Sequence, residues 1–158
     1  MTSQAADPAV RVAGPADSGA VGQLLHDFNR EFGDPTPPLD RLAERVRKLM
    51  AEGEMTVLVA GAGPDGVAVL RFRHAIFTEA LECYLAELYV RPGVRRRGLG
   101  RALLQTAIDL ARSRGADRMD LGTSDSDVAA RALYESLGFS NREGRTDGPV
   151  NYFYERGL

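Results

Sequence analysis

The sequence predicts one mixed α/β domain in which helices cover both faces of a single sheet. Its 158 residues give room for one domain, and its composition, 44% hydrophobic and 27% charged, is that of a folded chain. Short apolar runs bounded by turn formers alternate with segments whose apolar residues recur at helical spacing. We therefore expect a domain spanning residues 10–158, after a flexible N-terminal tail at residues 1–9.

The first part of the chain predicts two helices and four strands. Residues 10–13 alternate as a strand, and a helix follows from an N-cap at Asp17 or Ser18 to Gly33. A second helix places its apolar residues on one face and stops at Gly53. The next strands are apolar runs at 55–60, 67–72 and 81–90, and the last of them is expected to be a central strand.

The rest of the chain predicts two more helices and two short strands. Apolar residues recur at helical spacing from Gly98 to Gly115, and a strand follows at 119–122. A further helix begins at a cap, Asp127 or Ser126, and ends at Gly138. The tail at 149–154 is expected to form a last strand.

Charge is distributed unevenly along the chain. Twenty basic residues against 22 acidic ones give a net charge of −2, which disfavours a nucleic-acid-binding domain. Residues 1–94 hold nine basic and thirteen acidic residues, and 95–158 hold eleven and nine, so the net charges are −4 and +2. This indicates an anion held by the C-terminal part and a cationic partner met by the N-terminal part, where Asp27, Glu31 and Asp34 cluster. A solvated cluster of surface charges is the alternative for these acids.

Other sequence features exclude several classes of protein. No apolar run approaches the ~18 residues of a membrane span. The first residues lack the basic start and apolar core of a signal peptide, so we expect a cytoplasmic protein. The single Cys83 allows no internal disulfide, and His26 and His74 are too few for a histidine metal centre. We expect no metal, and we interpret Cys83 as a buried hydrophobe.

Two glycine-rich segments are candidates for phosphate binding. Residues 61–66 formally match Gly-x-Gly-x-x-Gly, but a strand-like run follows them, so we interpret them as a hairpin loop. Residues 91–100 instead join a strand to the start of an amphipathic helix. The free N–H groups and positive dipole end of a helix N-terminus, together with nearby arginines, favour an anion site there. A solvated basic turn is the alternative.

Two motifs resemble those of the GCN5-related N-acetyltransferases, the GNAT family. Arg95-x-x-Gly98-x-Gly100, after Leu88-Tyr89-Val90, is similar to the family's acetyl-CoA-binding motif. Residues 127–139 resemble its Asn-x-x-Ala-x-x-Leu-Tyr-x-x-x-Gly-Phe motif, with Asp127 in place of the usual Asn. An acid before Leu-Tyr-Val, combined with the Asp-x-x-Ala-x-x-Leu-Tyr form, is similar more loosely to aminoglycoside 3-N-acetyltransferases.

The resemblance implies a GNAT-like fold with a mostly antiparallel mixed sheet, acetyl-CoA as co-substrate and an amine as acceptor. Homodimers are common in the family. Backbone groups of the expected strand 81–90 would pair with the pantetheine amides, and the helix N-terminus would bind the diphosphate. The implied cofactor-binding residues are Leu88, Tyr89, Val90, Arg95, Arg96, Arg97, Gly98, Leu99, Gly100, Arg101 and Asp127.

Amine acetylation requires a base for the attacking amine and an acid for the leaving thiolate. Glu87 lies in an otherwise uncharged run, where burial would raise its pKa toward that of a useful base. An ion pair with Arg71 or Arg73 is the alternative role for Glu87, and Glu82 is a second candidate base.

The family motif implies that Tyr134 is the acid, while an aromatic packing residue is the alternative. With no convincing covalent nucleophile, we expect direct attack in a ternary complex, on a small cationic amine such as an aminoglycoside or polyamine rather than a protein amine. A non-catalytic acyl-CoA-binding module is the alternative function.

Overall fold

The structure is a computed structural model that describes residues 9–158. The chain falls into two compact units, one ending at Leu121 and one from Gly122 to Leu158. The flexible tail expected at residues 1–9 lies, except for residue 9, outside the described residues. Among the described residues, no helix is both long and apolar enough to cross a membrane.

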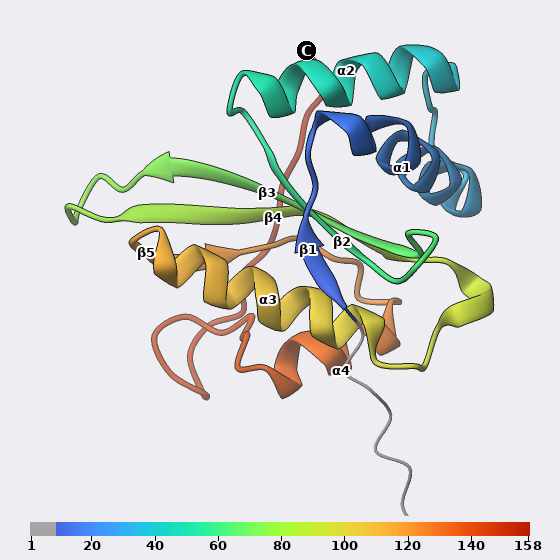
Figure 1. Cartoon of the computed structure of the whole chain (residues 1–158). Helices are drawn as coiled ribbons and strands as arrows, with labels where there is room; N and C mark the ends of the chain where they lie inside the picture. The colour runs from blue at the N-terminus through green and yellow to red at the C-terminus, as the bar shows by residue number, and fades with distance from the viewer. Residues whose placement is uncertain (1–8) are drawn as a thin grey trace, which may run out of the picture. The chain divides into compact units, whose positions relative to one another are not determined.

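The first unit is built on a five-stranded sheet with the order β1-β2-β3-β4-β5 (Figure 1). The first three pairings are antiparallel, and β4 pairs with β5 in parallel. This confirms the prediction of a mostly antiparallel mixed sheet in an α/β fold. The strands are β1 (Val10–Val12), β2 (Thr56–Ala60), β3 (Gly66–His74), β4 (Leu81–Val90) and β5 (Ala116–Asp120).

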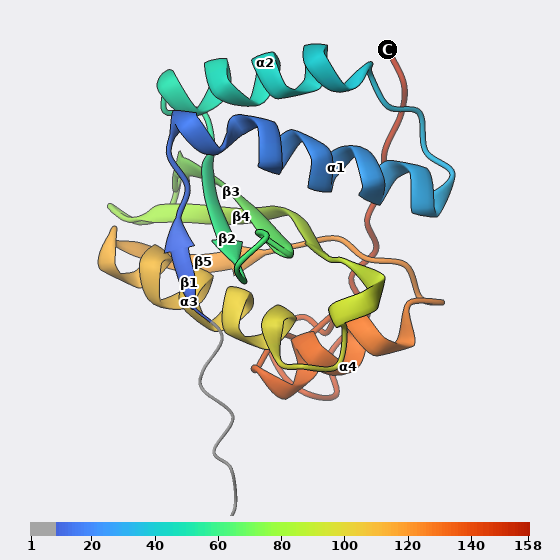
Figure 2. The same cartoon turned by 45° about the vertical axis from the view of Figure 1, so that its right-hand side comes forward.

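Helices cover both faces of this sheet, as the sequence predicts. The helices α1 (Ser18–Phe32) and α2 (Leu39–Ala51) lie on one face, and α3 (Leu99–Ser113) lies on the other (Figures 1 and 2). Two short 3-10 turns, η1 (Pro15–Asp17) and η2 (Pro92–Val94), precede α1 and α3.

The core between the sheet and α1–α2 consists mainly of valines on alternate strand positions. Branched side chains suit a pleated, buried surface. Val21 and Leu24 of α1 and Val46 of α2 pack there. The sheet contributes Val57, Val59, Val67, Val69 and Tyr89.

The predicted helix ends are close to the observed ones, but one cap differs. Gly33 ends α1 at φ 75°, a left-handed conformation that glycine adopts without steric cost. Asp17 precedes α1 but does not cap it with its side chain. Its carboxylate accepts hydrogen bonds from Arg11 and from the Gly14 N–H at 2.8 Å, so it stabilises the η1 turn instead.

The second unit contains α4 (Val128–Ser136), which begins at the predicted cap. The Asp127 carboxylate accepts a hydrogen bond from the Ala130 N–H at 3.1 Å. The last strand predicted at 149–154 is wrong, because only Val150 forms a bridge, with Arg142. A segment with alternating side chains forms a strand only where a neighbouring strand pairs with its backbone. The aromatic residues at 152–154 are exposed.

Candidate active site

A bulge in β4 decides which side chains share a face of the sheet. Val69 of β3 lies opposite Glu87, whereas the next residue, Leu70, lies opposite Leu85, so Ala86 is an extra residue in β4. Directly opposed residues point to the same face. Glu87 therefore shares the α1–α2 face with Val69. Because of the bulge, Glu82 also lies on this face, opposite Arg73.

The Glu87 carboxylate is half-buried and has no polar partner in the part of the chain that the structure describes. Burial raises its pKa, and the negative charge of Asp34, two residues beyond the end of α1, raises it further. The alternative in which Glu87 pairs with Arg71 or Arg73 is not observed within residues 9–158. The geometry leaves Glu87 free to accept a proton.

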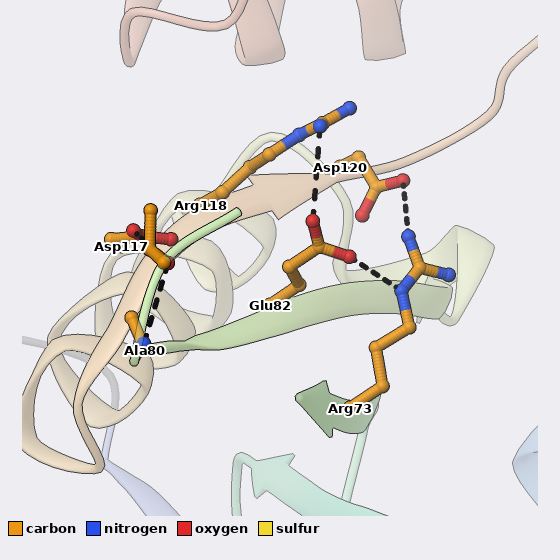
Figure 3. A network of polar contacts seen from close by, with 7 residues as sticks. Arg73, Ala80, Glu82, Asp117, Arg118 and Asp120 are labelled. Carbon is orange, nitrogen blue, oxygen red and sulfur yellow. Dashed lines mark hydrogen bonds and ion pairs between the residues drawn. The ribbon is translucent and has the colours of Figure 1, made fainter. Parts of the chain in front are cut away.

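Glu82, the second candidate base, lies in a network of charges shown in Figure 3. Its Oε2 accepts a hydrogen bond from Arg73 Nε at 2.6 Å, and its Oε1 lies 3.9 Å from Arg118 Nη1. Arg73 Nη2 also lies 3.7 Å from Asp120 of β5. Both oxygens of Glu82 are thus engaged with arginine side chains, in contrast to those of Glu87.

One edge of the second half of β4 has no strand partner in the first unit. β5 pairs with β4 from Leu81 to Tyr84 only, and β3 occupies the other edge along the whole strand. Backbone groups on this edge from Leu85 to Tyr89 therefore lack a strand partner and could pair with an extended ligand, whereas the Val90 carbonyl already accepts a hydrogen bond from Arg95 Nε at 2.8 Å. This is the edge that the expected contacts of Leu88 and Val90 require.

The turn after β4 leads to a helix N-terminus without a side-chain cap. Arg96 and Gly98 have φ of 63° and 82°, and α3 begins directly after Gly98. Gly98, the residue that precedes α3, has no side chain that could cap the first N–H groups of the helix. A Cβ atom built on Gly98 would meet no atom within 4 Å, so the space around the turn is open. The backbone here fits an anion such as a diphosphate.

The three arginines of this turn differ in their contacts. Arg95 Nη2 donates to both carboxylate oxygens of Glu31, at 2.7 and 2.9 Å, and Arg95 Nε donates to the Val90 carbonyl at 2.8 Å. Arg96 and Arg97 are exposed and have no polar partner among the described residues. Those two guanidinium groups are free for an anion, whereas that of Arg95 is already engaged.

In the second unit, Tyr134 packs edge-on against Phe139, with ring centroids 6.0 Å apart. Burial, assisted by the charge of Asp127, raises the pKa of Tyr134 to about 12. The hydroxyl therefore stays protonated at neutral pH and can act as a donor. The ring contact also agrees with the alternative of a packing role.

The remaining sequence candidates have structural roles. Burial raises the pKa of Cys83 to about 11, so its thiol is not a nucleophile at neutral pH. Residues 61–66 join β2 to β3 as a hairpin, as predicted, and do not open a helix. Across residues 9–158, no group of three or more His, Cys, Asp or Glu residues is arranged to hold a metal ion.

Comparison with known proteins agrees with this geometry. The model of the acetyltransferase (GNAT) family matches residues 21–139. This chain belongs to the GNAT family. It is an N-acetyltransferase, and the resemblance seen in its two motifs is confirmed. Members of the family use acetyl-CoA.

Three similar proteins place this N-acetyltransferase among its relatives. Aminoglycoside N(6')-acetyltransferase type 1 of Stenotrophomonas maltophilia is 32% identical over 88% of this chain and 90% of its own. The crystal structure of a protein classed as an acetyltransferase, from Arthrobacter sp. FB24, is 43% identical, with a TM-score of 0.85 over 99% of both chains. Mycothiol acetyltransferase of Beutenbergia cavernae is 51% identical over 53 residues, but the match spans only 34% of this chain and 18% of that protein.

Sequence reasoning missed two features of the site. The extra residue Ala86 carries no signal in the sequence, because an alanine in an apolar run looks like any other strand position. The acids at the end of α1 were expected to face a cationic partner. In the structure Glu31 binds Arg95, and Asp27 accepts a hydrogen bond from Gln23 at 2.8 Å. The negative charge of Asp34 instead helps to raise the pKa of Glu87.

Proposed function

We propose that this N-acetyltransferase moves an acetyl group from acetyl-CoA to a primary amine by direct attack in a ternary complex. The observation that carries the proposal is the half-buried, unpartnered Glu87 with a raised pKa, next to a strand edge without a partner. A general base of this kind is most effective when its pKa lies near the working pH. The buried, protonated thiol of Cys83 supports direct attack over a covalent acetyl-enzyme.

We propose that acetyl-CoA binds along the second half of β4 and at the N-terminus of α3. The backbone of Leu88, Tyr89 and Val90 would pair with the pantetheine arm. The backbone from Gly98 to Arg101 would bind the diphosphate, with charge-assisted bonds from Arg96 and Arg97. The Asp127 carboxylate caps α4 through Oδ1, and its Oδ2 could accept a hydrogen bond from the arm.

The chemistry needs two proton transfers. The neutral form of the acceptor amine attacks, and Glu87 takes one of its protons as the nitrogen forms a bond to the thioester carbonyl carbon. As the carbon–sulfur bond breaks, Tyr134 donates its hydroxyl proton to the CoA sulfur. The family motif supports this role, and the Tyr134 hydroxyl carries its proton at neutral pH.

For the acceptor, we propose a small cationic amine such as an aminoglycoside or a polyamine. The similarity to the aminoglycoside N(6')-acetyltransferase of Stenotrophomonas maltophilia, which extends over most of this chain, supports this class. Asp34 adds support, because its negative charge acts on Glu87 and would also attract an ammonium group. The engaged carboxylate of Glu31 adds none.

A thiol-release assay with saturating acetyl-CoA and a panel of amines tests the proposal. We expect CoA release that depends on a primary amine and is faster with cationic acceptors than with neutral ones. Saturable acetyl-CoA binding without release for any amine would instead favour the non-catalytic acyl-CoA-binding module. Release with neutral or anionic acceptors alone would contradict the proposed substrate class.

Calorimetry tests the location of the cofactor. A carboxylate at position 100 would enter the space proposed for the diphosphate, so Gly100→Asp should weaken acetyl-CoA binding more than Arg96→Ala. Unchanged saturation by acetyl-CoA in Gly100→Asp would exclude this location.

A further inference from the structure

Glu31 and Arg95 connect two parts of the first unit that are 64 residues apart in sequence. Glu31 lies in the last turn of α1, and Arg95 lies in the turn between β4 and α3. Arg95 Nη2 reaches both carboxylate oxygens, at 2.7 and 2.9 Å. The pair therefore ties the helix on one face of the sheet to the turn proposed to bind the diphosphate.

Further contacts hold Arg95 in this orientation. Its Nε donates to the Val90 carbonyl at 2.8 Å, and its guanidinium carbon lies 5.6 Å from the centre of the Tyr89 ring. That ring is stacked on Phe28 of α1 at 5.1 Å. A planar guanidinium held by two donor atoms and one ring face has little freedom to turn.

These contacts bear on how Arg95 takes part in cofactor binding. A phosphate that bound Arg95 Nη2 would have to displace the Glu31 carboxylate, and such a ligand would also approach a negative charge. The contacts of Arg95 all fix protein groups: a helix end, a strand end and an aromatic ring. Arg95 therefore acts as a brace, meaning that it holds the turn in place against α1.

We propose that Arg95 and Glu31 act as a positioning pair, which braces the turn at 91–98 against α1 and so supports acetyl-CoA affinity without either side chain touching the cofactor. This inference rests on the proposed function, because it assumes acetyl-CoA at that turn. It assigns Glu31 a role in cofactor affinity although the negative charge of Glu31 would repel a phosphate.

The sign of one substitution separates this inference from a direct contact between Arg95 and a phosphate. If Arg95 binds a phosphate, Glu31→Gln frees the guanidinium and removes a negative charge, so acetyl-CoA should bind more tightly. If the pair is a brace, Glu31→Gln loosens the turn, so acetyl-CoA should bind more weakly. Arg95→Gln weakens binding in both cases and does not discriminate.

The experiment measures the dissociation constant of acetyl-CoA by calorimetry for the wild type, Glu31→Gln, Arg95→Gln and the double variant. We expect each single variant to bind roughly 3- to 30-fold more weakly. The double variant should bind no more weakly than the weaker single variant, because both changes break the same contact. Arg95→Lys keeps the charge but cannot hold the same contacts, so it should resemble Arg95→Gln.

Two matched variants control for the loss of any ion pair. Glu52→Gln and Arg112→Gln each break an exposed pair elsewhere in the unit, with Lys48 and with Asp109, and should leave affinity unchanged. Melting curves identify variants that have lost the fold, and Arg95→Lys then stands in for Arg95→Gln.

Failure of the proposed function and failure of this inference give different results. A wild type that does not bind acetyl-CoA would overturn the proposed function and this inference together. Wild-type binding with equal or tighter binding in Glu31→Gln would overturn the inference alone. Additive losses in the double variant would do the same.

Discussion

The two halves of β4 carry one glutamate each, and the surroundings of the two carboxylates differ. One is flanked by arginines, and the other has no polar partner among the described residues. In the first half, Leu81 to Tyr84, β3 and β5 pair with both edges of the strand, and arginines flank both oxygens of Glu82. In the second half, from Leu85 to Val90, β5 is absent, and Glu87 is half-buried without a polar partner among residues 9–158. The pairing of β4 with β5 and the arginine contacts of a glutamate are thus both confined to the first half of the strand.

This difference shows how one strand combines a structural and a chemical role. Where β5 is paired, its side chains Arg118 and Asp120 complete the network around Glu82 and Arg73 (Figure 3). Beyond Tyr84 no such neighbours are available in the first unit. Burial then raises the pKa of Glu87, and the open edge offers backbone groups to a ligand.

The largest expected effect comes from removing the base. Glu87→Gln should lower kcat/KM by roughly 10²–10⁴-fold, the usual contribution of a general base. Its melting temperature at neutral pH should equal or exceed that of the wild type. Because folding raises the pKa of Glu87, the folded protein loses stability as the pH rises above the ordinary pKa of a glutamate. Glutamine avoids that loss. Thiol release and melting curves measure both.

Glu82→Gln is the matched variant on the same strand and should show the reverse pattern. Turnover should stay within about threefold of the wild type, because both oxygens of Glu82 are engaged with arginines and Glu87 is the proposed base. The melting temperature should fall, because Arg73 and Arg118 lose their shared partner. A Glu82→Gln variant that is folded but inactive would make Glu82 the base and break the comparison.

The acid is tested by removing one hydroxyl. Tyr134→Phe should lower kcat by up to the same 10²–10⁴-fold while acetyl-CoA affinity changes little, because the ring and its contact with Phe139 remain. A packing role predicts near-normal turnover in Tyr134→Phe and a stability loss in Tyr134→Ala. Turnover within about threefold in Tyr134→Phe, with chemistry rate-limiting, would leave Tyr134 as a packing residue.

A smaller effect is expected from Asp34. Its negative charge helps to raise the pKa of Glu87, so Asp34→Asn should lower that pKa. Glu87 would then lose its proton at lower pH, and the acidic limb of kcat/KM should move toward lower pH. The limb should still lie above the pH typical of an exposed glutamate, because burial, the larger cause, remains. An unchanged limb would show that Asp34 does not act on the base.

The smallest effect is expected from Cys83, which lies in the paired half of β4. Its thiol is fully buried and its pKa is raised to about 11, so it cannot carry an acetyl group. Cys83→Ala should keep turnover within about threefold of the wild type and lose some stability through the small cavity. Rapid-mixing measurements should show no burst of CoA release in either protein.

Local signals in the sequence predicted most of this fold, and the misses have physical causes. Strand 81–90 and the glycine-terminated helices were predicted because alternation, spacing and turn formers are local properties. The tail at 149–154 has a strand-like pattern but only one bridging residue, since pairing depends on a neighbour that the pattern cannot show.

The site was predicted only in part for the same reason. The uncharged surroundings of Glu87 indicated a raised pKa, and the structure bears out that direction. Its relation to Glu82 depends on the extra residue Ala86, which looks like any other apolar position. The pairing of Glu31 with Arg95 spans 64 residues, and no local pattern specifies it.

The pH dependence of kcat/KM tests most directly whether the two glutamates differ as the structure indicates. The wild type and Glu82→Gln should share an acidic limb whose pKa is raised above that of an exposed glutamate and lies below the pKa of the acceptor amine, ~10. The residual activity of Glu87→Gln should lack that limb. A limb that persists unchanged in Glu87→Gln, or that disappears in Glu82→Gln, would contradict the assignment of Glu87 as the base.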